Sequence, residues 1–261
     1  MKKSAVNLKS GWVKESSLND PDSGRSPIFY AAGFDWRAAE AYLFDIDGTL
    51  LNSRDAVHYW ALHHAIEKIY GLKFDATGVP IHGNTDVGIL RGFMEKTGVA
   101  AKDWLPQLGR VVDLISSEVE SNAADLRPQL CPSIQDLIQD LHSRGKLLGV
   151  ASGNLERVGW AKLKACGLKD YFSFGSFSDR NEKRDDIFSY AAAAARSMLH
   201  PDARVYVVGD TPADIASAHV NQLPVIAVAT GIYEPHELAT HSPEMCVPCC
   251  TDLLAWTSTR A

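Results

Sequence analysis

Two carboxylates stand two residues apart in residues 44–50 (FDIDGTL), directly after a short apolar run. In an extended strand, residues i and i+2 point to the same face, so Asp45 and Asp47 are expected to project into one site. Gly48 then allows the backbone to turn sharply. Because two like charges repel each other, a divalent cation, a shared proton or a phosphoryl substrate with its own metal must offset them. The pattern therefore predicts chemistry at the end of a strand.

Two later segments also place polar groups directly after apolar runs. They are residues 151–154 (ASGN) and residues 209–214 (GDTPAD). Open parallel sheets bind ligands at the carboxyl ends of their strands. If the strands before these segments are neighbours of the first one, Ser152 and Asp210 converge on the paired aspartates.

Short apolar strands alternate with helices in the second half of the chain. Continuous apolar strands of this kind are typical of a parallel sheet that helices cover on both faces. The predicted fold class is therefore α/β, with a doubly wound, Rossmann-like parallel sheet. We expect strands near 41–44, 146–151, 172–174, 204–208 and 224–228, and helices near 158–166, 185–198 and 214–220.

A long helical stretch separates the first strand from the others. Apolar residues recur at helix spacing from Val57 to Ile69, Gly71 is placed to end that helix, and Thr85 is placed to cap the next one. No strand is expected over 54–128. An insertion directly after a catalytic turn suits a lid over the site. Further helices are predicted near 85–97, 103–121 and 133–144.

These patterns divide the chain into three parts. Residues 1–37 are rich in Ser, Asn, Asp, Pro and Gly, and are predicted to form an N-terminal arm of loop character that is partly disordered. Residues 38–55 and 129–261 are expected to form the α/β core domain. Residues 56–128 are expected to form an inserted α-helical cap domain.

Composition narrows the class of protein. The 261 residues are 46% hydrophobic, enough for a sizeable core, and the net charge of −6 argues against a nucleic-acid partner. No apolar run is long enough to cross a bilayer. No hydrophobic segment follows the basic start, as it would in a secretory signal. We therefore expect a cytoplasmic protein, monomer or homodimer, that binds neither nucleic acid nor membrane.

The five cysteines include Cys246 and Cys249, which have the C-x-x-C spacing of a zinc or redox site. No second C-x-x-C exists, and the pair is not predicted to lie between a strand and a helix. Since a zinc site normally needs four ligands, the cysteines are interpreted as incidental and reduced.

The three polar segments together resemble motifs I, II and IV of the haloacid dehalogenase superfamily. They occur in that superfamily's order, and the resemblance spans about residues 40–255. The helical insertion is similar to the superfamily's C1 type of cap. Residues 83–86 (GNTD) and the pair Lys162-Leu163 resemble the phosphoglycolate-phosphatase-like branch.

The resemblance implies a role for each aspartate. Asp45 would be the nucleophile that forms an aspartyl-phosphate. Asp47 would protonate the leaving alkoxide and then activate water; it must be protonated part of the time, which the charge of Asp45 favours. An acidic residue at this second position is typical of phosphatases and phosphomutases rather than dehalogenases. Asp45, Asp210 and the main-chain carbonyl of Asp47 would bind Mg²⁺, with Asp214 as a further ligand or as its support.

The phosphate-binding groups follow from motifs II and III. Ser152 and the N–H of Gly153 would bind phosphoryl oxygens, and Asn154 would shape that loop. As an alternative, Ser152 caps the following helix, a role compatible with phosphate binding. The cation of motif III is either Lys183 or Arg184, since the usual Lys-Pro pair is absent; Arg184 is preferred, although a solvated charge at a helix start remains an alternative for each.

The resulting hypothesis is a Mg²⁺-dependent phosphatase acting on small phosphorylated metabolites. The alternative within the fold is a phosphomutase acting on a sugar phosphate. A non-catalytic binding protein is the third candidate, and it would normally have lost Asp45 or Asp210. The cap should select the substrate, and its polar candidates, none of them assigned, are His58, His63, His64, His82 and Arg91.

Overall fold

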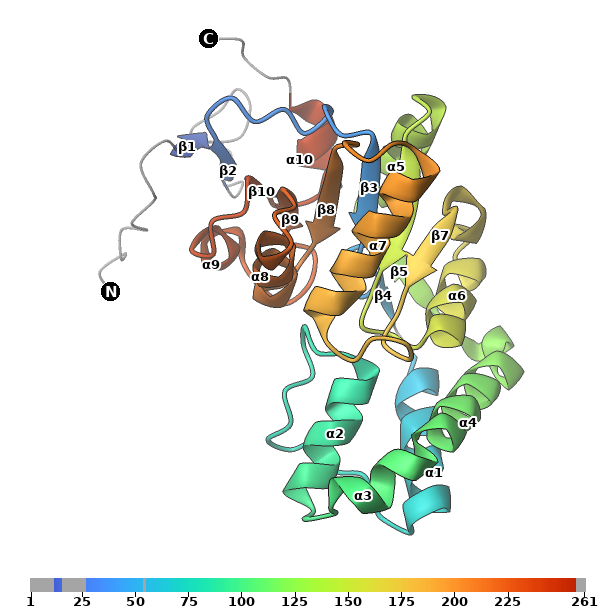
Figure 1. The fold of residues 1–261 in the computed structure, drawn as a ribbon. Helices are drawn as coiled ribbons and strands as arrows, with labels where there is room; N and C mark the ends of the chain where they lie inside the picture. Colours follow the sequence, from blue (N-terminus) through green and yellow to red (C-terminus); the bar gives the residue numbers. More distant parts are fainter. Residues whose placement is uncertain (1–11, 16–26, 54, 257–261) are drawn as a thin grey trace.

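An eight-stranded sheet in the order β1-β2-β10-β9-β8-β3-β6-β7 forms the centre of the computed structural model, which describes residues 12–15, 27–53 and 55–256 (Figure 1). The strands from β10 to β7 pair in parallel, whereas β1 and β2 join the edge antiparallel. The predicted doubly wound α/β class is therefore confirmed. The strands are β1 (Trp12–Glu15), β2 (Ile28–Ala31), β3 (Ala41–Phe44), β6 (Leu147–Ala151), β7 (Phe174–Ser176), β8 (Val205–Gly209), β9 (Val225–Val228) and β10 (Met245–Val247).

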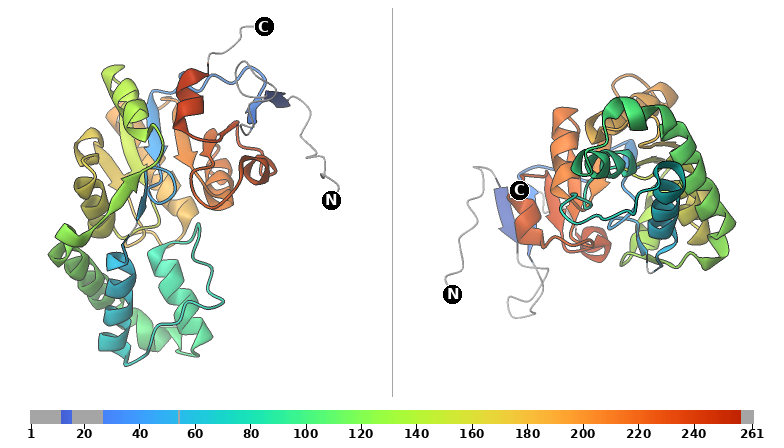
Figure 2. Two further views of the ribbon diagram at one scale, coloured as in Figure 1. Left: turned by 180° about the vertical axis from the view of Figure 1, so that it is seen from behind. Right: turned by 90° about the horizontal axis from the view of Figure 1, so that it is seen from below.

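Helices cover both faces of this sheet because its strands bury side chains on both sides. In β3, Tyr42 and Phe44 join the core beneath α5, α6 and α10, whereas Ala41 and Leu43 join the core beneath α7, α8 and α9. The two layers appear on opposite sides of the sheet (Figure 2). The helices are α5 (Ile134–Ser143), α6 (Glu156–Ala165), α7 (Arg184–Met198), α8 (Pro212–Val220), α9 (Pro235–Ala239) and α10 (Cys250–Ala255).

A separate helical layer lies beyond the carboxyl ends of β3 and β8 (Figure 1). It has its own apolar core, which includes Phe93, Trp104 and Val111, and Leu155 and Val158 at the start of α6 pack into that same core. The layer is thus attached to the sheet through α6. Its helices are α1 (Val57–Tyr70), α2 (Asp86–Lys96), α3 (Ala101–Trp104) and α4 (Leu108–Ser121).

Two short strands mark where the chain leaves and re-enters the sheet domain. β4 (Leu51–Ser53) and β5 (Pro128–Leu130) pair antiparallel, with Leu51 opposite Leu130. Neither strand was expected from the sequence. They hold the two ends of the helical layer side by side.

Several local predictions are confirmed and others need correction. Thr85 caps α2 by accepting a hydrogen bond from Gly88 N (2.9 Å), and Gly71 ends α1 with φ +66°. The single helix expected over 103–121 is wrong: α3 ends and α4 begins around a 3₁₀ turn that contains Pro106, which has no N–H to continue an α-helix. The strand expected at 172–174 lies two residues later, and α8 begins at Pro212.

The loop predicted for the N-terminal arm is also wrong within the described residues. β1 and β2 extend the sheet, and Ile28 and Phe29 are buried in it. Residues 1–11 and 16–26 lie outside the described residues. Throughout the parts that the structure does describe, no helix is both long and apolar enough to span a bilayer.

Candidate active site

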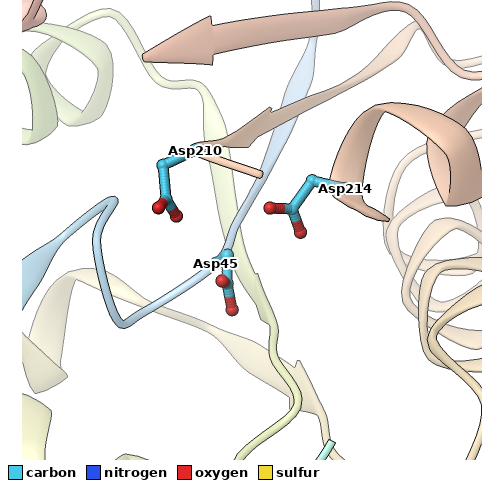
Figure 3. A group of neighbouring side chains, drawn as sticks. All are labelled: Asp45, Asp210 and Asp214. Atoms are coloured by element: carbon cyan, nitrogen blue, oxygen red, sulfur yellow. The ribbon is translucent and has the colours of Figure 1, made fainter. Parts of the chain in front are cut away.

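Three buried carboxylates meet at the carboxyl ends of β3 and β8 (Figure 3). Asp45, Asp210 and Asp214 each offer one oxygen atom, and these oxygens lie within 4.8 Å of one another. The sheet register explains the meeting, because Phe44 pairs with Val208 and Asp45 N donates a hydrogen bond to Val208 O (3.0 Å). The residues that follow these two paired strands are therefore side by side.

Glycine backbone encloses the Asp210 carboxylate on two sides. A Cβ atom on Gly48 would lie 2.2 Å from Asp210 Oδ2, and one on Gly231 would lie 1.9 Å from the same oxygen. Thr49 Oγ1 donates a hydrogen bond to Asp210 Oδ1 (3.0 Å). Gly48 also has φ +88°, which favours glycine. The carboxylate is thus held in one orientation by close backbone approach.

Gly231→Ala is expected to lower kcat/KM of any reaction that uses this carboxylate cluster at least about tenfold, and to weaken the cluster's apparent affinity for a divalent cation such as Mg²⁺. The added methyl group would force Asp210 to rotate, and about 1 Å of misplacement can cost about 100-fold in rate. Activity would be titrated against Mg²⁺ concentration. Gly109→Ala, within α4 and with nothing within 4 Å of the added Cβ, is the matched control. Equal activity of the two variants would contradict this account of the glycine.

The three buried carboxylates repel one another, and a bound cation would offset this repulsion. Burial, together with the neighbouring carboxylates, raises the pKa of Asp45 and of Asp210 above the usual range for a carboxyl group. Asp45 Oδ1 is buried and has no hydrogen-bond partner among the described residues. An orphaned buried carboxylate oxygen beside a second carboxylate is the oxygen-rich environment that Mg²⁺ prefers.

Arg184, at the start of α7, is the cation that reaches this cluster. Its Nη1 lies 2.5 Å from Asp214 Oδ1 and 3.6 Å from Asp45 Oδ2, and its Nε donates to Gly83 O (3.2 Å). Burial opposes its charge, but the surrounding carboxylates outweigh burial and raise the pKa of the guanidinium. Lys183, by contrast, is exposed.

Asp214 uses both oxygens within the protein. Oδ1 binds Arg184, and Oδ2 accepts hydrogen bonds from Thr211 N (3.0 Å) and Thr211 Oγ1 (2.7 Å). It closes a capping box at the start of α8 with Thr211. These contacts favour Asp214 as a support for Arg184 over Asp214 as a direct metal ligand.

The loop 152–154 lies against the same cluster. Ser152 is buried, and a hydrogen bond from it lowers the pKa that burial raises at Asp45. It does not cap α6, whose N-cap residue is Leu155, so the capping alternative is wrong. A Cβ on Gly153 would lie 2.6 Å from Asn84 O. The loop is therefore positioned between the aspartates and the helical layer.

Lys162 is a buried residue of this site that was not assigned from the sequence. Its Nζ lies 2.7 Å from Asp47 Oδ2 and 2.8 Å from Asn154 Oδ1, and Asn154 Nδ2 donates to Asp47 Oδ2 (2.8 Å). Burial raises the pKa of Asp47, but Lys162 and Asn154 outweigh burial and hold that pKa below its usual range. The expectation that Asp47 is protonated part of the time, favoured by the charge of Asp45, is therefore wrong for this arrangement, in which Lys162 and Asn154 favour the ionised form. A lysine four residues after buried Val158, on the buried face of α6, was the available signal.

One cavity of about 380 Å³ joins these groups to the helical layer. Of the five polar candidates from the cap, His58 and His82 line it. His58 Nε2 lies 3.2 Å from Asp86 Oδ2. His63, His64 and Arg91 are not among the lining residues, and Arg91 instead forms an ion pair with Glu182 of the sheet domain.

The cysteines do not form a second site among the described residues. All five are free, and the aspartate cluster is the only metal-ligating group found there. Cys246 lies on β10 and Cys249 precedes α10. The expectation that this pair does not lie between a strand and a helix was wrong, because β10 and α10 are too short to stand out in the sequence.

Comparison with known proteins agrees with this geometry. Residues 42–228 match the profile of the haloacid dehalogenase-like hydrolase family, so the chain belongs to that family. It is 29% identical over 218 residues to phosphoglycolate phosphatase of Synechococcus elongatus, covering 82% of this chain and 95% of the relative. It is 27% identical over 213 residues to hexitol phosphatase A of Escherichia coli, covering 78% of this chain and 92% of the relative.

A solved structure is similar in fold. The β-phosphoglucomutase of Clostridium difficile superposes with a TM-score of 0.60 at 19% identity, covering 82% of this chain and 93% of that one. The expected superfamily and its phosphoglycolate-phosphatase-like branch are thereby confirmed. The chain is a phosphoric monoester hydrolase of this family.

Proposed function

We propose that the protein is a Mg²⁺-dependent phosphatase that hydrolyses small phosphorylated metabolites through an aspartyl-phosphate on Asp45. The observation that carries the proposal is the buried Asp45 carboxylate, with one orphaned oxygen and with Arg184 at 3.6 Å, at the base of a cavity of about 380 Å³. A nucleophile, a cation and space for a phosphoryl group thus occur together.

The donor atoms fit Mg²⁺. Asp45, Asp210 and the main-chain carbonyl of Asp47 would hold the ion, with Asp214 fixing Arg184 nearby. When bound, the ion supplies positive charge that offsets the repulsion between the carboxylates and the phosphate. Arg184 adds a fixed charge beside Asp45, where negative charge gathers during phosphoryl transfer.

The first chemical step uses Asp45 and Asp47. A carboxylate oxygen of Asp45 attacks phosphorus, the bond between phosphorus and the leaving oxygen breaks, and Asp47 donates its proton to that oxygen. Ser152 and the N–H of Gly153 bind the phosphoryl oxygens. In the second step, Asp47 takes a proton from water, the oxygen attacks phosphorus, and the bond to Asp45 breaks to release phosphate.

Asp47 needs a proton for the first step, although Lys162 and Asn154 favour its ionised form. A phosphate dianion that binds beside it adds negative charge and raises its pKa. Protonation of Asp47 is thus coupled to substrate binding. Lys162 and Asn154 also fix where the carboxyl group points.

Phosphate release from a panel of monoesters, including 2-phosphoglycolate and a hexitol phosphate, tests the proposal. We expect release with Mg²⁺, loss of at least about 99% of the rate with EDTA, and recovery when Mg²⁺ is restored. Activity that EDTA leaves unchanged would contradict the metal assignment. Rapid quenching measures how long the phosphoenzyme survives in water, and this lifetime separates the mutase alternative from the phosphatase. The phosphoenzyme of a mutase must resist hydrolysis over many turnovers, whereas that of a phosphatase is hydrolysed in each one.

A further inference from the structure

We infer that the substrate's leaving group is an uncharged, mainly apolar alcohol, which the helical layer holds against Tyr59, Ile81 and Phe74. The inference rests on the proposed function and specifies its substrate class. It follows from the wall of the cavity opposite the aspartates, from the charges of the lining residues and from the hydrogen bonds that those residues already make.

Apolar side chains form the wall opposite the aspartates. Leu62, Phe74 and Ile89 are buried members of the core of the helical layer, and they also line the cavity. Tyr59 and Ile81 extend that wall, and both are exposed, at 47% and 45%. Exposed apolar side chains next to a catalytic site mark a surface that a ligand covers.

The sheet domain contributes one more apolar side chain to the cavity. Ile232, in the loop between β9 and α9, is 58% exposed and lines the same cavity. It follows Gly231, whose backbone lies against Asp210. A leaving group that extends from the phosphate therefore meets apolar surface from both domains.

The charges disfavour an anionic leaving group. Among the lining residues that the structure describes, the permanently charged cations are Lys162 and Arg184. Lys162 is bound to Asp47, and Arg184 is bound to Asp214. A carboxylate on the leaving group would find both cations already paired, in a cavity whose lining also includes the carboxylates of Asp55 and Asp86.

The hydrogen bonds disfavour a polyol. Asn84 Nδ2 donates to Pro80 O (2.9 Å), and its Oδ1 accepts from Thr85 N (2.8 Å). Asp86 Oδ2 accepts from Leu155 N (2.8 Å) and faces His58. Asn52 Nδ2 donates to Thr230 O (3.2 Å). Asn84, Asp86 and Asn52 thus already bind within the protein, and among the described residues Ser53, His82 and the Tyr59 hydroxyl are the lining groups left to bind a hydroxyl of the leaving group. A polyol would find few further donors and acceptors.

A series of primary alkyl phosphates tests the inference at constant leaving-group chemistry. With Mg²⁺ present, kcat/KM for hexyl phosphate should exceed that for ethyl phosphate at least about tenfold, since each fully buried methylene contributes about fourfold. The phosphate ester of 6-hydroxyhexanoate carries a carboxylate in place of the terminal methyl group, and its kcat/KM should fall at least about tenfold below that of hexyl phosphate. A hexitol phosphate or 2-phosphoglycolate as the best substrate would overturn the inference.

Binding of phosphonates separates this inference from the proposed function. Hexylphosphonate cannot be hydrolysed, and we expect calorimetry with Mg²⁺ to find it at least about tenfold tighter than ethylphosphonate. If every ester turns over but neither kcat/KM of the alkyl phosphates nor affinity for the phosphonates depends on chain length, the inference fails and the proposed phosphatase activity stands. If hexylphosphonate binds tightly but no ester turns over, the proposed function fails and the apolar subsite stands.

Ile81→Lys provides the test within the chain. Ile81 is exposed enough to tolerate the change, and the new ammonium group should shift preference from hexyl phosphate toward the carboxylate-bearing ester at least about tenfold. Val220→Lys, at the end of α8 and 65% exposed, is the matched control and should keep the original ratio. An unchanged ratio in Ile81→Lys would contradict the placement of the leaving group.

Discussion

Asp45→Asn is expected to lower kcat by about 10⁴-fold or more while raising the thermal stability of the metal-free protein. The amide keeps the shape of the side chain but is not a nucleophile, so no acyl phosphate forms. It also removes one of three buried carboxylates whose oxygens lie within 4.8 Å. Steady-state kinetics and thermal unfolding in EDTA would measure the two effects.

The stability effect has a definite pH dependence. Burial and like charges raise the pKa of Asp45 and Asp210, so the folded state binds more protons than the unfolded chain above about pH 4. These two groups should therefore make the metal-free protein less stable as pH rises from about 4 to about 8, the folded-state pKa of Asp210, and Asp45→Asn should lose less stability over that range. Asp202→Asn, an exposed change away from the cluster, should match the wild type in both measurements. Full activity in Asp45→Asn would refute the nucleophile.

Arg184→Met is expected to lower the free energy of unfolding by about 3–5 kcal/mol and kcat by at least about 100-fold. The guanidinium is buried, and its removal leaves Asp214 and Asp45 without their cation. Lys183→Met is the matched control one residue away. Because Lys183 is exposed, its loss should change stability by less than about 0.5 kcal/mol and leave the rate within about threefold.

A double variant separates the two roles of Arg184. In Arg184→Met with Asp214→Asn, the nearer of the two carboxylates left without a cation is gone, so part of the lost stability should return. The rate should not return, since the charge beside Asp45 is still missing. Recovery of both stability and rate would mean that Arg184 acts only on folding. If Lys183→Met lowered the rate as much as Arg184→Met does, the assignment of Arg184 as the cation of the site would be contradicted.

Sequence patterns were sufficient for the parts of the fold that are locally determined. β3, β6, β8 and β9 are continuous apolar runs, and Asp45, Ser152 and Asp210 follow such runs directly. Their convergence needed only the rule that parallel strands end at one edge. Thr85 and Gly71 were likewise predictable, because capping and left-handed turns depend on one residue type each.

The remainder depends on contacts between distant segments. β1, β2, β4 and β5 have three or four residues each, and pairing rather than local propensity makes them strands. Lys162 is a catalytic-site neighbour only because α6 packs it against Asp47, 115 residues earlier in the chain. The choice between Lys183 and Arg184 depended on which side of the first turn of α7 faces the carboxylates, a direction that adjacent residues cannot reveal.

The pairing of β4 with β5 also has a consequence for how the chain folds. Residues 54–127 form one excursion whose two ends are joined, with Ser53 opposite Pro128. Once this pair has formed, the distance between β3 and β6 no longer depends on whether the helices inside the excursion have folded. The entropy of closing that loop is then lost once, in a six-residue ladder, rather than again in each later strand pairing. The β4–β5 pair therefore shortens the effective sequence separation between β3 and β6, which lowers the effective contact order of the sheet. The sheet can then form independently of the rate at which the inserted helices fold.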